Sequence, residues 1–441
     1  MAPRAGWADS AAPGAEQRSA GVRRGPLRGS WRGPAPHADP RIIAQMTTAT
    51  ATEVTVPLLD LKAQYATIRA EVEPVVLEVM ESQYFIGGPK IDQLEKEVAA
   101  YCHTKHAIGC ANGSDAILLA LQALDIGPGD EVILPTFTFF ATAGSVHRLG
   151  ARPVFVDIDP VTYNICPKSV EEAFGCCKKV KCLMPVHLFG QAADMDSIMA
   201  IAKARGLTVV EDCAQAIGTE DVHGRRVGSI GDIGTYSFFP SKNLGGFGDG
   251  GVMATNSDAL GARMKRLRNH GMEPKYYHQE IGMNSRLDAL QAAVLSIKLR
   301  HLDSWSAARQ KNAKFYDEFF RTHGAADTSV AVDAGGLPLR FPKAPAKGRH
   351  IYNQYAIRVP GRIRDAVRDE LTKRKIGTEI YYPLCLHMQE CFKFLGYTQG
   401  VFPHSERAAQ ETIALPIYGE MTEAQRHWVA ESVVEAVKKL A

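Results

Sequence analysis

The chain has 441 residues, of which 45% are hydrophobic and 22% are charged, and its formal net charge is +3 at neutral pH. This length predicts about two domains with a sizeable core, and no apolar run approaches the ~20 residues of a membrane span. The positive charge is concentrated in residues 1–45, which hold seven arginines against three acidic residues. The remainder therefore lacks the cationic excess that nucleic-acid binding requires.

The N-terminal segment 1–52 is rich in Ala, Arg, Gly and Pro and has no hydrophobic periodicity. It cannot bury enough apolar surface to offset the entropy of ordering, so we predict a disordered extension. It also lacks the apolar core of a secretory signal. Two origins stay open, an organelle transit peptide or a start codon assigned upstream of Met46.

Helical and β-like segments alternate from Pro57 onward, beginning with helical spacing over 68–82 and 90–101. Apolar, β-branched runs separated by helices predict an α/β fold whose mostly parallel sheet is covered on both faces. The predicted strands are 106–110, 131–135, 153–157, 181–186 and 207–211, and the predicted intervening helices include 116–124 and 141–149.

The second half of the chain predicts a change of domain. Strong helical patterns cover 282–300 and 302–320, and the second of these helices is expected to cross between domains. We predict a large domain over 53–300, a connecting helix and loop over 301–349, and a small C-terminal α+β domain over 350–441.

The nine cysteines form no Cys-x-x-Cys pair, and only Cys176 and Cys177 are adjacent. An odd number of cysteines without a framework predicts reduced thiols and a cytoplasmic location. His103 and His106 are too few to indicate a metal site, and we predict none.

A lone lysine, Lys242, lies between two β-like runs, 235–239 and 251–255, and a glycine-rich segment follows it. Glycines allow the backbone to pass close to a bulky group. A partly desolvated lysine can condense with an aldehyde, which makes Lys242 a candidate Schiff-base lysine for pyridoxal phosphate. The alternative for an isolated lysine is a surface residue in a turn. The run 246–251 also fits the dinucleotide fingerprint, but that motif must open a helix, and a β-like run follows here.

The stretch 110–115 closes one predicted strand and opens a helix. Free amides and the helix dipole make such a junction an anion site, suited to a phosphate. The alternative is a plain helix N-terminus capped by Ser114 or Asp115.

Asp212 ends a predicted strand, where open α/β sheets bind their ligands. A buried carboxylate must be paired, and a pyridinium nitrogen is a suitable partner, because the carboxylate keeps the ring protonated as an electron sink. The alternative is a helix-capping residue. Phe137, Phe139 and Phe140 follow the strand 131–135, and one of them could stack on the ring.

This order of a phosphate loop, an aromatic residue, a strand-end Asp and a lysine resembles the fold-type I pyridoxal-phosphate enzymes. More narrowly, the chain from about Val56 to its C-terminus is similar to the DegT/StrS sugar aminotransferases. The resemblance implies a large domain with a seven-stranded sheet between helices and a smaller C-terminal domain. The motifs that carry it are Ala-Asn-Gly-Ser-Asp-Ala at 111–116, Leu-Pro-Thr-Phe-Thr-Phe at 134–139, His-Leu-Phe-Gly at 187–190, Glu-Asp-Cys-Ala-Gln-Ala at 211–216, Ser-Phe-Phe-Pro-Ser-Lys at 237–242 and Asn-Ser-Arg-Leu-Asp-Ala-Leu-Gln-Ala-Ala at 284–293.

The resemblance also implies a role for each matching position. Lys242 would hold pyridoxal phosphate as a Schiff base and move protons between cofactor and substrate. Asp212 would pair with the pyridine nitrogen, and Gln215 would hydrogen-bond the ring hydroxyl. Phe139 would stack on the ring face. The phosphate would be held by Gly113, Ser114, Asp115 and Ser237.

In this family the functional unit is a homodimer with shared active sites, which implies that Asn284 reaches the partner's phosphate. Arg286 is a candidate for binding a substrate or donor carboxylate, and its alternative is a salt bridge to Asp288 or Glu280. Further candidates for substrate contacts are Tyr382 and His387. Many members carry His-Tyr-Pro where this chain has Tyr-Tyr-Pro at 381–383, so any anion contact made by that histidine is in doubt here.

The implied reaction moves an amino group, most often from L-glutamate, to a keto carbon of a nucleotide-linked hexose. The segment 270–278 is similar to members that aminate C3, and a 4-keto substrate is the alternative. A hypothesis from another class is a regulatory protein with the same fold and no turnover. The joint presence of Lys242, Asp212 and Gln215 argues against it, because a binding-only protein needs no proton shuttle.

Overall fold

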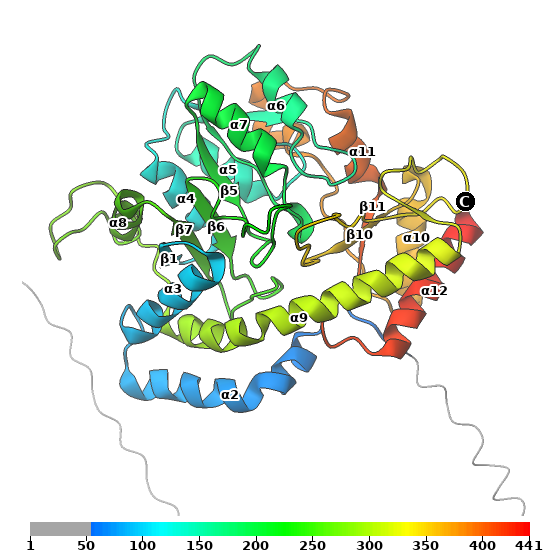
Figure 1. The fold of residues 1–441 in the computed structure, drawn as a ribbon, viewed down its shortest axis with the longest axis horizontal. Helices are drawn as coiled ribbons and strands as arrows, with labels where there is room; N and C mark the ends of the chain where they lie inside the picture. The colour runs from blue at the N-terminus through cyan, green and yellow to red at the C-terminus, as the bar shows by residue number, and fades with distance from the viewer. Residues whose placement is uncertain (1–53) are drawn as a thin grey trace, which may run out of the picture. The chain divides into compact units, whose positions relative to one another are not determined.

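A seven-stranded sheet lies at the centre of this computed structural model, which describes residues 54–441 (Figure 1). The strand order is β1-β7-β6-β5-β4-β2-β3. The pairs β2–β3, β2–β4, β4–β5 and β5–β6 are parallel, and β7 is antiparallel to both neighbours. The strands are β1 (His106–Cys110), β2 (Glu131–Pro135), β3 (Arg152–Val156), β4 (Val180–Leu183), β5 (Thr208–Asp212), β6 (Ile233–Ser237) and β7 (Gly251–Thr255).

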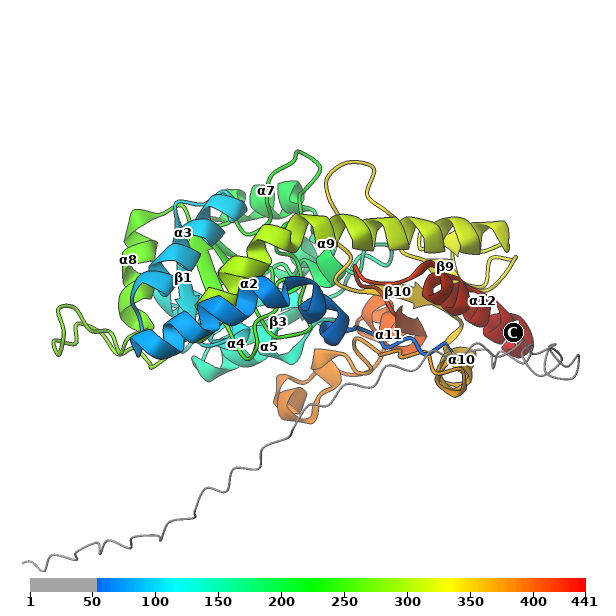
Figure 2. The ribbon, with the colours of Figure 1, turned by 90° about the horizontal axis from the view of Figure 1, so that it is seen from below.

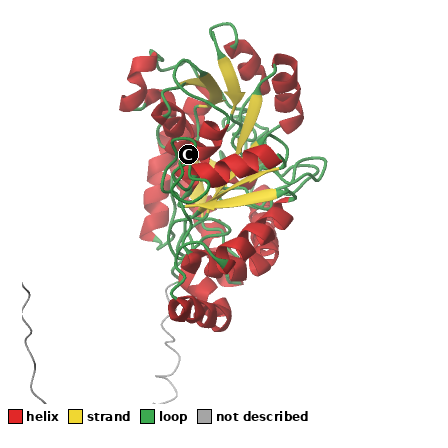
Figure 3. Ribbon diagram, turned by 90° about the vertical axis from the view of Figure 1, so that its left-hand side faces the viewer, coloured by secondary structure: helices red, strands yellow, loops and turns green. Residues whose placement is uncertain are grey.

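Helices cover both faces of this sheet (Figures 2 and 3). Alternate residues of β2 show the two layers, because successive side chains of a strand point to opposite faces. Val132 and Leu134 pack with α4 and α5, whereas Ile133 packs with α6 and α7. The helices of this region are α2 (Leu61–Ser82), α3 (Pro89–Cys102), α4 (Gly113–Ala123), α5 (Phe140–Arg148), α6 (Pro167–Ala173), α7 (Met195–Arg205) and α8 (Asp258–Leu267).

One helix, α9 (Ala289–Thr322), replaces the two helices predicted over 282–300 and 302–320. It is continuous because its 34 residues contain neither glycine nor proline, so nothing interrupts the hydrogen-bond ladder. It begins later than predicted because the preceding residues are extended and pair with the chain after α8, as in the bridge between Asn269 and Asn284. Figure 1 shows α9 running from the central sheet to the region of α10 and α12.

A second sheet of four short strands has the order β11-β10-β9-β8. Its core contains apolar residues of α9, such as Tyr316 and Phe320, packed against β10, β11 and α12. The segment predicted to be a loose loop, 325–349, contributes two of its strands. The elements are β8 (Ala326–Asp327), β9 (Arg340–Phe341), β10 (Tyr355–Arg358), α10 (Gly361–Lys373), the 3₁₀ turns Leu386–Met388 and Glu390–Leu395, α11 (Pro403–Glu411), β11 (Thr412–Leu415) and α12 (Glu423–Leu440).

The predicted α/β fold is confirmed, and β1, β2 and β7 have the predicted bounds. Three strands end earlier than predicted, β3 by a single residue and β4 and β6 by more. After β6 the chain turns back at Phe239, whose carbonyl accepts the Lys242 amide at 2.8 Å. After β4 comes Pro185, which lacks the N–H of a regular strand residue.

The predicted domain boundaries stay a prediction, and the predicted disorder of residues 1–52 lies outside the described residues. Within residues 54–441, no helix combines the length and the apolar character needed to cross a membrane.

Candidate active site

Lys242 lies just after β6, in the turn that opens the glycine-rich loop. Burial lowers the pKa of its amine to about 8, and the nearby Asp212 carboxylate partly opposes this shift. A lower pKa leaves more of the neutral amine at physiological pH, and the neutral amine is the form that attacks an aldehyde. The structure therefore brings the predicted lysine and the predicted carboxylate into electrostatic contact.

Asp212 is the last residue of β5 and is buried. Its Oδ2 accepts a hydrogen bond from the Thr142 hydroxyl at 2.8 Å, and its Oδ1 accepts one from the Ala214 amide at 3.1 Å. Burial raises the pKa of the Asp212 carboxyl, while these hydrogen bonds and the charge of Lys242 act in the opposite direction. Two carboxylate oxygens accept about four hydrogen bonds in total, so room remains beside these two for a further donor such as a pyridinium N–H.

Gln215 follows the same strand end, and its amide has a defined orientation. The Phe189 amide donates to Gln215 Oε1 at 2.8 Å, and Gln215 Nε2 donates to the Tyr382 hydroxyl at 3.1 Å. Because a backbone N–H requires an acceptor, the side-chain oxygen must face Phe189 and the nitrogen must face Tyr382. The second N–H of Gln215 is left to bind an acceptor, as the predicted contact with a ring hydroxyl oxygen requires.

The N-terminus of α4 is capped by Asn112, and not by Ser114 or Asp115 as the alternative interpretation supposed. Asn112 Oδ1 accepts the Asp115 amide at 2.8 Å. No described residue accepts a hydrogen bond from the amides of Gly113 and Ser114, so these two donors are free to bind an anion.

Ser237, the last residue of β6, packs directly against Gly113. A Cβ on Gly113 would lie 2.6 Å from the Ser237 Cβ and 2.9 Å from its Oγ, so only glycine fits there. Ser237 Oγ accepts the Phe239 amide at 3.3 Å, which leaves the hydroxyl hydrogen free to donate. Gly113 and Ser237, which are both predicted to hold the phosphate, are thus in contact.

Asp115 has partners that argue against the predicted phosphate contact. Its amide is used by the Asn112 cap, and its carboxylate accepts the Ser285 hydroxyl at 2.8 Å. Ser285 Oγ also accepts the Ala111 amide at 3.2 Å. Asp115 therefore ties the start of α4 to the segment that carries Asn284 and Arg286.

Phe139 and Tyr382 lie at the open side of this site. The Phe139 side chain is 56% exposed, and its ring centroid is 6.1 Å from that of Tyr382. Burial raises the pKa of the Tyr382 phenol, which therefore stays protonated and able to donate. A cavity of about 300 Å³ adjoins Phe139 and is also lined by Ser114, Phe140 and His147.

Among the described residues Arg286 forms no salt bridge to Asp288 or to Glu280, and Glu280 pairs with Arg263 and Arg266 instead. Its Nη1 donates to Asn269 Oδ1 at 2.9 Å. The Arg286 Nε is buried and has no partner among the described residues. A buried donor without an acceptor is costly, so Arg286 is suited to an anionic ligand.

Asn284 lies two residues before Arg286 and is exposed. An exposed side chain at this position is available to a second subunit, as its predicted contact with a partner's phosphate requires.

His387 has partners that argue against the predicted substrate contact. It is 1% exposed, and both ring nitrogens are engaged, Nδ1 with the Thr136 hydroxyl at 2.8 Å and Nε2 with Glu406 at 3.2 Å. Burial also lowers the pKa of its imidazole. A neutral ring with no free nitrogen cannot bind a substrate, and His387 instead joins the 3₁₀ turn to the residue after β2.

The buried group His187, Glu211 and Cys213 is the one set of described residues whose spacing resembles a metal site. The ligand atoms of His187 and Glu211 are already used. The Ala193 amide donates to His187 Nδ1 at 3.0 Å, and His187 Nε2 lies 3.0 Å from Glu211. The Glu211 carboxylate also accepts the amides of residues 228, 230 and 231, so it has no lone pair left for an ion. This network instead holds β5 in place beside Asp212.

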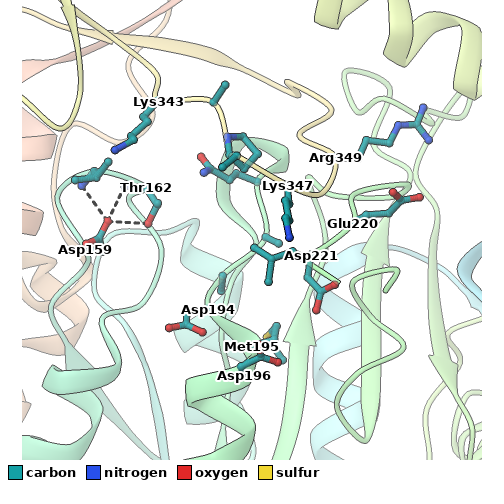
Figure 4. A pocket seen from close by; sticks show the side chains of 18 of the residues that line it. Asp159, Thr162, Asp194, Met195, Asp196, Glu220, Asp221, Lys343, Lys347 and Arg349 are labelled. Carbon is teal, nitrogen blue, oxygen red and sulfur yellow. Dashed lines mark hydrogen bonds between the residues drawn. The ribbon is translucent and has the colours of Figure 1, made fainter. Parts of the chain in front are cut away.

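Figure 4 shows a separate cavity of about 480 Å³, which none of the predicted site residues lines. Lys343 and Lys347 face it from one loop, opposite Asp159 and Asp221. Both carboxylates are already bound, Asp159 to the amides of residues 161 and 162 and Asp221 to Arg225. The cavity therefore offers no free acidic group of its own at these two positions.

Sequence reasoning missed Asn112, Thr142 and Ser285, which position the predicted residues. The sequence does hold a signal for Thr142, because Thr138, Thr142 and Ser145 follow helical spacing. In the structure all three are buried. Nothing local pointed to Ser285, whose partners are about 170 residues away in the sequence.

The residues at this edge of the sheet fit pyridoxal phosphate by their chemistry. The Lys242 amine suits the aldehyde, the Asp212 carboxylate suits the pyridine nitrogen, and Gln215 suits the ring hydroxyl. The free amides of Gly113 and Ser114 suit the phosphate.

The lowered pKa of Lys242 leads to a testable pH dependence. Covalent attachment of pyridoxal phosphate to the cofactor-free protein should speed up about tenfold per pH unit below the amine's pKa and level off above it, because only the neutral amine reacts. The midpoint should lie at about 8, well below the ordinary value of 10.5. Rapid-mixing absorbance measurements would test this, and a rate that still rises through pH 9.5 would contradict it.

Fold and site together place this chain among the aminotransferase-type enzymes, with Lys242 and Asp212 at one edge of the sheet. The chain belongs to the DegT/DnrJ/EryC1/StrS aminotransferase family, whose model matches residues 66–434. The family predicted from the motifs is thereby confirmed.

Two relatives illustrate the range of the family. A pleiotropic regulatory protein of Geobacillus stearothermophilus is 49% identical over 88% of this chain and 100% of its own. A UDP-N-acetyl-3-dehydro-alpha-D-glucosamine 3-aminotransferase of Acidithiobacillus ferrooxidans is 42% identical over 84% of this chain and 95% of its own.

Two solved structures share the fold. S. venezuelae DesV in complex with a ketimine intermediate superposes with a TM-score of 0.81 at 38% identity, covering 88% of this chain and 100% of its own. The NtdA protein of Bacillus subtilis with its bound cofactor PMP superposes with a TM-score of 0.78 at 30% identity, covering 88% and 86%.

Proposed function

We propose that this protein is a pyridoxal-phosphate-dependent aminotransferase that moves an amino group from L-glutamate to C3 of a nucleotide-linked 3-keto hexose. The observation that carries the proposal is the placement of Lys242 and the buried Asp212 at the ends of two neighbouring parallel strands, where the charge of Asp212 acts on the Lys242 amine.

Pyridoxal phosphate, when bound, supplies the electron sink for labilising the bonds of an amino acid. Asp212 would then keep a proton on the ring nitrogen, and its buried position would strengthen that interaction. The Lys242 amine would hold the cofactor through its aldehyde and would move a proton between the cofactor and the carbon of the bound substrate. The amides of Gly113 and Ser114 and the Ser237 hydroxyl would hold the phosphate, and Arg286 would hold the donor carboxylate.

Amination at C3 is supported by the relatives. The Acidithiobacillus relative is named for a 3-dehydro sugar, and a dTDP-3-amino-3,4,6-trideoxy-alpha-D-glucose transaminase of Streptomyces venezuelae is 39% identical over 88% of this chain. The alternative is a 4-keto substrate.

A homodimer with shared sites completes the proposal. Large apolar side chains are exposed beside the lysine loop, at Phe239 and Phe247, and on the segment before Asn284, at Tyr276, Tyr277 and Ile281. Exposed apolar surface of this kind marks a protein interface. Sedimentation should give about twice the 48.1 kDa mass of the chain. All nine cysteines are free, which supports the predicted cytoplasmic location.

The second candidate function is regulation without turnover, which the name of the Geobacillus relative favours. Both candidate functions allow cofactor binding, so the test must measure transfer of the amino group itself. Purified protein loaded with pyridoxal phosphate should be yellow, and L-glutamate should shift its absorbance. Matched 3-keto and 4-keto nucleotide sugars should then be offered to the aminated enzyme, with product mass and position determined. An absorbance spectrum that glutamate does not change would favour the regulatory function. A product aminated at C4 would show that the substrate is a 4-keto sugar and not a 3-keto sugar.

A further inference from the structure

Two side chains of α9 hold the backbone of the glycine-rich loop that follows Lys242. Gln291 Oε1 accepts the Phe247 amide at 2.8 Å, and Lys298 Nζ donates to the Gly245 carbonyl at 2.5 Å. Gln291 and Lys298 are two helical turns apart, so they project from the same face of α9. One face of a rigid element thus contacts the loop at two points, three and five residues after the lysine.

Glycines in the loop allow this close approach. A Cβ on Gly246 would lie 2.8 Å from Gln291 Oε1, and a Cβ on Gly248 would lie 2.9 Å from Gln291 Nε2. A Cβ on Gly245 would lie 2.3 Å from the Pro240 carbonyl oxygen. The contact of Gly245 with the Pro240 backbone excludes a side chain there, whereas a Cβ on Gly246 or Gly248 would push the end of the Gln291 side chain away. The loop is thus packed against both the helix and the turn that carries Lys242.

Lys298 is hard to explain by stability alone. It is 2% exposed, and the carboxylate of Glu420 acts on its amine only as a nearby charge, without a hydrogen bond between them among residues 54–441. Its Nζ lies 5.7 Å from the Phe247 ring centroid and 5.9 Å from that of Trp305. Burial lowers the pKa of this amine to about 8, which reflects the cost of keeping a charge there. A buried apolar side chain of similar volume is commonly as stable or more so, so the contact with Gly245 is the feature that distinguishes a lysine here.

We propose that Gln291 and Lys298 are positioning residues for Lys242. They fix the loop backbone after the lysine and thereby the direction from which its amine meets the cofactor. They act through the loop and are not assigned any contact with cofactor or substrate. This inference rests on the proposed function, because it takes Lys242 as the reacting amine.

Matched variants separate the two contacts from the general stability of α9. Gln291→Leu removes the acceptor for the Phe247 amide, and Gln291→Glu keeps an acceptor of the same reach. Lys298→Met removes the donor and keeps the length of the side chain. Lys314→Met is the control on the same helix, since the Lys314 side chain is 77% exposed.

The first measurement is hydrogen exchange in the cofactor-free protein. Losing one hydrogen bond should speed exchange of the peptide covering 239–250 by about three- to tenfold in Gln291→Leu and in Lys298→Met. Gln291→Glu should restore most of the protection, and Lys314→Met should match the wild type. The second measurement is on the loaded enzyme, where the two disruptive variants should lower kcat with little change in KM and shift the pH midpoint of the cofactor absorbance.

Unchanged exchange in both disruptive variants would overturn the inference. Exchange that rises equally in all peptides would also overturn it, because the two side chains would then be merely structural. If the wild type never reacts with pyridoxal phosphate, the proposed function fails, and the exchange of the cofactor-free loop still decides whether α9 holds it.

Discussion

Replacing Lys242 by alanine should abolish the reaction with L-glutamate. The amine is both the covalent attachment point and the proton carrier of the proposed mechanism, and a positioned acid–base group alone contributes about 10²–10⁴-fold. We therefore expect the single-turnover rate to fall by at least about 10⁴-fold when both roles are lost. Stopped-flow absorbance of the loaded variant with glutamate is the measurement.

The matched control for this variant is Lys265→Ala, which changes a lysine in the last turn of α8 outside the site. Folding of Lys242→Ala is not expected to suffer, because burial disfavours the charged amine and its removal relieves that cost. Glutamate turnover that survives in Lys242→Ala, at a rate within tenfold of wild type, would rule out the proposed mechanism.

Asp212→Asn should produce the second large loss. The amide has nearly the same shape as the carboxylate, so it can accept from the Ala214 amide while its NH₂ group donates to the Thr142 hydroxyl, which can turn to accept. The fold should therefore tolerate the change. The negative charge that keeps the ring nitrogen protonated is lost, and we expect kcat for glutamate to fall by about 10²–10⁴-fold.

A comparison with Thr142→Val separates the effect of the Asp212 charge from the effect of the hydrogen bond that Thr142 donates to it. That variant removes one hydrogen bond to Asp212 and keeps the carboxylate, so its loss should be much smaller, roughly tenfold or less. Equal losses in Asp212→Asn and Thr142→Val would contradict the assignment of the carboxylate as the partner of the ring nitrogen. Cofactor affinity, measured in parallel, shows whether each loss arises in binding or in the reaction.

The proximity of Lys242 and Asp212 could be predicted from sequence because parallel strands end at the same edge of a sheet. Asp212 ends β5, Lys242 follows β6, and these strands are parallel neighbours. Apolar runs such as 131–135 are bounded by polar and turn residues, so the first and last residues of these strands could also be predicted from the sequence. Helix α9 was misjudged because its central polar residues look like an interruption when its packing partners are unknown.

The side chains that orient the site were harder to predict. Gln215 is oriented by the amide of Phe189, and Asp115 is held by Ser285, and both contacts join segments that are distant in sequence. His387 follows a motif associated with substrate contacts, yet the tertiary structure buries it beside Thr136 and Glu406. Its burial depends on how the 3₁₀ turn packs after β2, which no local pattern records.

The unbroken course of α9 limits how this protein can move. A helix of 34 residues spans roughly 50 Å and bends sharply only where a glycine, a proline or an inserted group weakens it. Its first turns hydrogen-bond the glycine-rich loop after Lys242. Further along the same helix, Arg309 donates to the carbonyls of Tyr352 and Asn353 near the second sheet. A displacement at one end of α9 therefore also moves the other end. Any closure of the protein around a sugar must come from bending in segments other than α9.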